Sequence, residues 1–113
     1  MIQTTTPRWE AMRTDESRMV EETLRNVGFL QVDSYRYNPA SIRVRVIDPR
    51  FEGLKIEKRY ELIEPHLERL PEHTQADIMS LFTFAPSELN ESPKTLRQFM
   101  KNTEFEDPSP SML

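Results

Sequence analysis

Residues Ser41–Leu70 decide the fold, and they read S-I-R-V-R-V-I-D-P-R-F-E-G-L-K-I-E-K-R-Y-E-L-I-E-P-H-L-E-R-L. Ile42–Ile47 alternates apolar and polar residues with a period of two, which is typical of a strand with one buried face. After Gly53 the period changes to intervals of four and three, which indicates one face of a helix. The apolar residues on that face are Ile56, Tyr60, Ile63, Leu67 and Leu70.

A strand that leads into a helix needs a second strand beside it, and downstream the chain offers Ala76–Phe84. The predicted unit is β-helix-β, with a right-handed crossover and parallel strands. Upstream, Phe29–Asn38 is rich in residues that favour strands. The turn residues Asn38–Ser41 join it to Ile42–Ile47 as an antiparallel hairpin. We therefore predict a three-stranded mixed sheet.

Two helices are predicted to cover one face of this sheet. The first is Glu16–Val27, which ends at Gly28, where a left-handed backbone conformation costs least. The second is Ile56–Leu70, in which Pro65 predicts a kink or a break. The polar segment Pro71–Gln75 is predicted to be a simple connection. The fold class is therefore α+β, with a core in the order α-β-β-α-β.

The chain divides into one domain and two ends. Residues 14–90 form the predicted domain, and residues 91–102 form an additional C-terminal helix. Residues 1–13 show neither periodicity and are predicted to be an extended or disordered arm, in which Trp9 is the residue able to dock. Residues 103–113 are acidic and then rich in proline and serine, which predicts a disordered tail.

Length and composition restrict the function classes. A chain of 113 residues has room for one small core. It contains no cysteine, which excludes disulfides, thiolate metal sites and cysteine catalysis. No apolar run approaches a membrane span and no signal peptide is recognised, so a cytoplasmic location is expected. The net charge of −4 argues against general coating of nucleic acid, although a local basic patch fits an acidic domain.

The order helix, hairpin, helix, strand resembles the BolA family over roughly Glu16–Leu89. The family's arginine-phenylalanine-x-glycine turn after the second strand is matched by Arg50–Gly53. The family's arginine-histidine-arginine run in the following helix corresponds to Arg59-Tyr60-Glu61. The family's third strand and its exit correspond to Thr83–Ala85 and Glu88–Leu89. BolA-like folds are similar to the class II KH arrangement, so the resemblance implies a small KH-like domain.

The resemblance also implies a partner and a cofactor. Family members dock on monothiol glutaredoxins and share a two-iron cluster, held partly by a histidine at the start of the third strand. Here that position is Asp77, and the hairpin loop Asn38–Ser41 has neither histidine nor cysteine. Because such clusters prefer thiolate or imidazole ligands, we expect no cofactor. A shared iron-sulfur cluster is the alternative, with His73 as the candidate replacement ligand.

The first functional hypothesis is a non-enzymatic adaptor that docks a protein partner, with monothiol glutaredoxin implied by the resemblance. The sequence has no nucleophile triad with a supporting motif, no phosphate loop and no metalloprotease helix, so we do not expect an enzyme. The residues predicted to bind the partner are Arg50, Phe51, Gly53, Arg59, Tyr60 and Asp77.

The alternative hypothesis is a regulatory nucleic-acid-binding protein. Its basic residues would bind the anionic backbone, and its phenylalanines would act as stacking platforms on an open sheet face. An opposing interpretation is that the arginine stems cover the sheet and that the C-terminal helix covers the rings. A third possibility is that the Pro93–Asn102 helix provides a different interface. The nucleic-acid candidates are Arg43, Arg45, Lys55, Lys58, Phe82 and Phe84.

Overall fold

The computed structural model describes residues 7–90 and 95–113, and it is built around a three-stranded sheet with the order β1-β2-β3. β1 (Gln31–Asn38) pairs with β2 (Ser41–Ile47) in antiparallel orientation, and β2 pairs with β3 (Ile78–Phe84) in parallel orientation. The predicted mixed sheet is therefore confirmed. Since β2 is central, β1 and β3 are its two edges.

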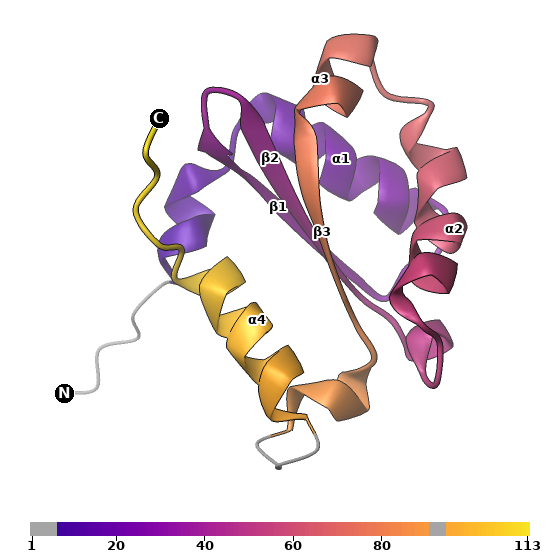
Figure 1. Ribbon diagram of the computed structural model, residues 1–113. Coiled ribbons are helices and arrows are strands. Elements are labelled where there is room, and N and C mark those ends of the chain that lie inside the picture. Colours follow the sequence, from indigo (N-terminus) through magenta and orange to yellow (C-terminus); the bar gives the residue numbers. More distant parts are fainter. Residues whose placement is uncertain (1–6, 91–94) are drawn as a thin grey trace, which may run out of the picture.

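Helices lie on both faces of the sheet (Figure 1). α1 (Asp15–Asn26) and α2 (Ile56–Leu67) pack on one face, as predicted. The short α3 (Glu72–Asp77) leads into β3, and α4 (Leu96–Glu106) packs on the opposite face. Three short 3-10 helices complete the described part of the chain, and in none of it is a helix long and apolar enough to cross a bilayer. They are η1 (Arg8–Met12), η2 (Pro49–Phe51) and η3 (Pro86–Leu89).

The main core lies between the sheet and the helices α1 and α2. The alternation in β2 directs Ile42, Val44 and Val46 into this core, where all three are fully buried. α1 contributes Val20 and Leu24, which are likewise fully buried. The same alternation directs the intervening arginines of β2 to the opposite face, because successive strand residues point to opposite sides.

A second, aromatic cluster lies on that opposite face. Trp9 of η1, Tyr35 of β1 and Phe105 of α4 are all buried, with the Tyr35 and Phe105 rings 4.8 Å apart and the Trp9 and Phe105 rings 5.5 Å apart. The Tyr35 hydroxyl donates a hydrogen bond of 2.8 Å to the Phe105 carbonyl. The cluster therefore ties both ends of the described chain to the sheet.

This cluster corrects two predictions about the chain ends. Residues 8–12 form η1, with Trp9 docked, in place of an extended or disordered arm; residues 1–6 lie outside the described part. α4 continues beyond Asn102 to Glu106, into the predicted disordered tail. Beyond α4, Ser109 accepts a hydrogen bond of 2.7 Å from the Tyr37 hydroxyl. The predicted helix start at Pro93 lies outside the described residues.

Two further predictions fail between α2 and β3. The predicted connection Pro71–Gln75 instead contains most of α3, which is held in place by Thr74, a fully buried side chain. As a result β3 begins at Ile78 rather than Ala76. α2 continues past Pro65 without a break and ends at Leu67, before the predicted end at Leu70. Pro65 removes one helical hydrogen bond in the last turn of α2.

Trp9 provides a test of the aromatic cluster. Its indole Nε1 is buried without a hydrogen-bond partner among the described residues, so replacement by phenylalanine loses packing volume but no hydrogen bond. We expect Trp9→Ala to lower the free energy of unfolding by about 3–5 kcal/mol. Trp9→Phe should cost less than about 1.5 kcal/mol. Urea denaturation measures both values, and equal losses would show that the ring does not support the fold as described.

Candidate functional site: a groove beside β3

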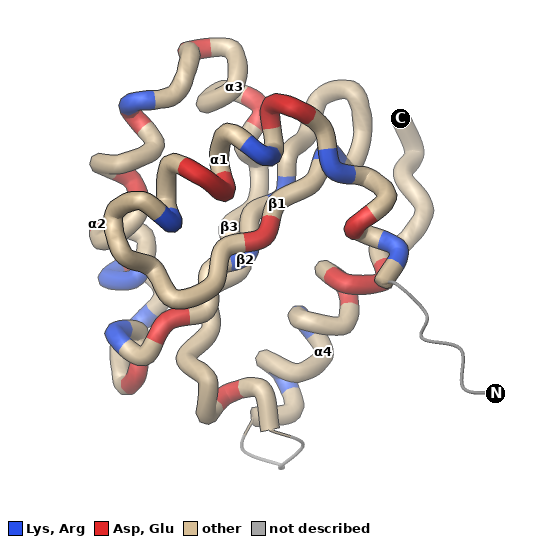
Figure 2. Tube along the Cα trace, turned by 180° about the vertical axis from the view of Figure 1, so that it is seen from behind, with Lys and Arg blue, Asp and Glu red and all other residues tan. Residues whose placement is uncertain are grey.

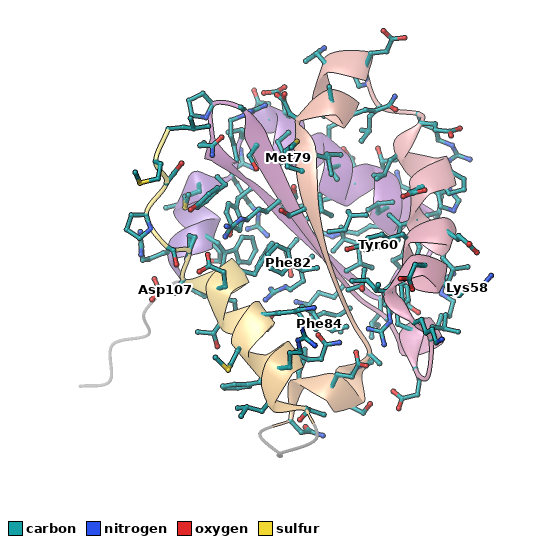
Figure 3. The ribbon with its side chains drawn as sticks, viewed as in Figure 1. Lys58, Tyr60, Met79, Phe82, Phe84 and Asp107 are labelled. Carbon is teal, nitrogen blue, oxygen red and sulfur yellow. The ribbon has the colours of Figure 1, made fainter. Side chains whose placement is uncertain are left out.

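A groove with a volume of about 1040 Å³ runs along the outer edge of β3, between α2 and α4. Its floor is the edge strand, and Tyr60, Phe82 and Phe84 lie between β3 and the two helices (Figure 3). The α2 wall carries Glu64 of the helix and Glu68, which directly follows it. The α4 wall carries Arg97 and Lys101, and all four side chains are exposed. The walls of the groove therefore have opposite charges.

One end of the groove is closed by the buried side chain of Arg59, which is only 4% exposed. Its guanidinium donates two hydrogen bonds of 2.7 Å to the Glu88 carboxylate and one of 2.9 Å to the Thr83 carbonyl. Arg59 was predicted to bind a partner, but the structure uses it to fasten α2 to η3. The apolar periodicity did not predict this role. It placed Ile56 on the buried face of the helix, whereas Ile56 is exposed and Arg59 is buried.

Glu88 is held as a carboxylate by this arrangement. Burial by itself would raise its pKa, but hydrogen bonds from Arg59 and from the Ala85 amide outweigh burial, so the pKa lies below its ordinary value. The Ala85 N–H donates to the carboxylate at 2.9 Å, which also fixes the start of η3. Arg59 and Glu88 thus neutralise each other's charge.

Tyr60 lies in the groove wall, half-buried, and its hydroxyl donates to the Leu81 carbonyl at 3.2 Å. Burial raises the pKa of Tyr60, and the nearby carboxylates of Glu57 and Glu64 raise it further. Tyr60 therefore stays protonated and acts as a donor toward the edge of β3.

The turn Arg50–Gly53 lies at the other end of the sheet from Asp77. Phe51 is fully buried, and Gly53 has a φ of 73°, a conformation that favours glycine, so both have structural roles. Arg50 pairs with Asp48 at 2.9 Å and lies over the Phe29 ring. The turn therefore supports the core, with the Arg50 side chain at its surface.

Asp77 is the last residue of α3, where it pairs with Arg36 at 2.9 Å. Arg36 also pairs with Glu16, so these three side chains fasten α3 to β1 and α1. The six residues predicted to bind a partner consequently do not form one patch. His73 is exposed and lies 3.6 Å from Glu16. Within the described residues no group of three or more acidic, histidine or cysteine side chains is placed to hold a metal ion.

The residues proposed to bind nucleic acid are also separated. Arg43 lies under α4, where it donates to Glu104 at 2.8 Å and stacks on the Tyr37 ring with its guanidinium carbon 3.7 Å from the ring centroid. Phe82 packs against Phe105 of α4, and Phe84 is buried. The prediction of stacking platforms on an open sheet face is therefore wrong, because α4 covers that face.

Arg45 is even more enclosed, being 3% exposed. It pairs with Asp33 at 2.6 Å and with Glu106 at 3.0 Å, and it donates to Asn102 at 2.8 Å. The interpretation that arginine stems cover the sheet holds, but their charged heads are neutralised by acidic side chains instead of lying in water. Of the basic candidates, the two on the N-terminal side of α2 remain exposed: Lys55 and Lys58.

Comparisons of the chain with protein-family models, with curated proteins and with solved structures found no match. The function of the chain is therefore inferred from the geometry of the groove.

The Arg59–Glu88 pair predicts a pH dependence of stability. A carboxyl group whose pKa is lower in the folded state stabilises the fold above its unfolded-state pKa, and this contribution is lost as the pH falls through the folded-state value. We expect Glu88→Gln to lower the free energy of unfolding by about 2 kcal/mol at neutral pH and to reduce the loss of stability below about pH 5.

Urea titrations across this pH range measure the effect. Glu22→Gln is the matched control, because Glu22 is exposed and has no ion pair among the described residues. If both variants show the wild-type loss of stability in acid, Glu88 does not have the proposed role.

Proposed function

We propose that the chain is a non-enzymatic, cytoplasmic BolA-like adaptor that docks a protein partner in the groove along β3. The observation that carries this proposal is the open groove beside an edge strand, with the Met79 side chain 66% exposed on that strand. An exposed apolar side chain beside a concave surface is a usual element of protein interfaces. Docking there needs no cofactor ligand from this chain.

The charges of the groove favour protein over nucleic acid as its occupant. The glutamates of α2 face the basic residues of α4, so the charges of the two walls cancel. A phosphate backbone carries a single sign of charge and would meet Glu64 and Glu68 on one side. Arg43 and Arg45 are engaged by α4 and would become available only if that helix left the sheet.

The sequence supplies the first partner to test. The order of elements and the turn Arg50–Gly53 resemble the BolA family, for which docking on a monothiol glutaredoxin is implied. In the folded chain, Arg59 and Tyr60 of the helix run that also carries the resemblance reach the groove. Tyr60 is therefore the proposed contact, and Arg59 is proposed to keep the groove open by holding α2.

Mixing the protein with a monothiol glutaredoxin tests this proposal. We expect a complex in size-exclusion chromatography, formed with the cluster-loaded or the cluster-free partner. Met79→Glu should weaken it by about tenfold, because a charge would replace an apolar contact in the interface. Isothermal titration calorimetry measures the affinity of each variant.

Leu30→Glu is the matched control. Leu30 is as exposed as Met79, at 67%, but it lies before β1 and outside the groove. Its variant should bind as the wild type does. Absence of a complex with the wild-type protein would reject glutaredoxin as the partner, and equal weakening by both substitutions would reject the groove as the docking surface.

A further inference from the structure

We infer that the segment docked in this groove is an extended strand that adds to the edge of β3 and carries basic and acidic side chains in alternation. The inference rests on the proposed docking function and names the chemistry of the docked segment. It follows from two properties of the groove: the backbone groups that β3 presents and the charges of the two walls.

The edge of β3 has a free donor in the groove. The carbonyls of Leu81 and Thr83 point away from β2, since they accept hydrogen bonds from Tyr60 and Arg59 of α2. In a strand the N–H and C=O of one residue point to the same side, so the Leu81 N–H also faces the groove. No acceptor for this N–H is provided by the described residues. An added strand would supply one.

Charged side chains occupy other parts of the two sheet edges. On β1, Glu21 accepts from the Ser34 N–H at 2.8 Å, and Arg25 donates to the Val32 carbonyl at 2.7 Å. On β3, the Arg59–Glu88 pair covers the end at Thr83. Such blocking protects edges from unwanted pairing. Among the described residues, no charged side chain bonds the backbone of Met79–Leu81, which lines the groove.

The walls of the groove determine which side chains the added strand should carry. Successive side chains of a strand point to opposite faces, so one set would point toward α2 and the other toward α4. The α2 wall presents Glu64 and Glu68, and the α4 wall presents Arg97 and Lys101. None of the four has an ion-pair partner in the described ranges. Basic residues alternating with acidic residues would pair with both walls.

A second copy of the chain fits the groove poorly. Two β3 strands paired antiparallel about a two-fold axis perpendicular to the sheet would bring α2 against α2 and α4 against α4. Glu64 and Glu68 would then face the same residues of the other copy, as would Arg97 and Lys101. Like charges placed opposite each other disfavour association, so the walls favour a different polypeptide.

A short capped peptide of alternating lysine and glutamate tests the inference with the full chain. We expect binding to the wild-type protein together with slower amide hydrogen exchange at Leu81, measured by NMR. A peptide of the same composition with its lysines and glutamates in two blocks should bind about tenfold more weakly. An alternating peptide with a central proline, which removes a backbone donor, should also lose affinity.

Charge exchange in the walls provides matched variants. Glu64→Lys with Glu68→Lys makes both walls basic and should weaken binding about tenfold. Adding Arg97→Glu and Lys101→Glu restores opposite charges, and the peptide can shift by one residue to meet them, so affinity should return. Tyr60→Phe frees the Leu81 carbonyl for the added strand and should tighten binding.

Several results would overturn the inference. Binding without protection of the Leu81 amide would mean that the groove docks a segment that is not a strand. Equal affinity for the peptide with its lysines and glutamates in two blocks would show that alternation of charge is not required for binding. Protection that grows with protein concentration in the absence of peptide would identify a second copy as the occupant, and preferential binding of a single-stranded oligonucleotide would identify nucleic acid. In each of these cases the glutaredoxin experiment still judges the docking function separately.

Discussion

The two arginines of β2 impose the constraint on which the rest of the structure depends. β2 is the central strand, so Arg43 and Arg45 lie against a sheet face that must be covered while their charges must be neutralised. Asp33 on the neighbouring strand satisfies part of this requirement, and the acidic end of α4 satisfies the rest through Glu104 and Glu106. α4 is therefore held on the sheet by charge as well as by the aromatic cluster.

The two ends of α4 carry opposite charges and have different roles. Figure 2 shows basic positions in the earlier part of the helix and acidic positions near its C-terminal end. The acidic end clamps the sheet, while Arg97 and Lys101 are left facing the groove. On the other side, Arg59 fastens α2 through Glu88, which leaves the next turns of α2 to present Glu64 and Glu68. The buried pairs thus determine which charges remain free.

The sequence predicts the sheet, its hairpin and the helices α1 and α2 because their apolar periods are local and strong. It does not predict α3, because this helix is too short to show an apolar period. The buried residue that anchors α3, Thr74, is polar and therefore does not stand out as a core residue. It names Trp9 as able to dock, but it misses the helical turn η1 and the extent of α4. Those elements depend on contacts such as Tyr35 with Phe105, which are distant in the chain and which no local pattern encodes.

The site was predictable only in part, for the same reason. Periodicity placed Tyr60 on the inner side of α2, where it does reach β3. The resemblance grouped it with Asp77 and the Arg50–Gly53 turn. Because β3 is parallel to β2, Asp77 before β3 and the turn after β2 lie at opposite ends of the sheet. The open edge of β3 lies between Asp77 and the Arg50–Gly53 turn. Side chains of α1 cover part of the β1 edge, and the Arg59–Glu88 pair covers one end of the β3 edge, so the stretch of β3 in the groove stays accessible. The charged walls beside it restrict what can pair there.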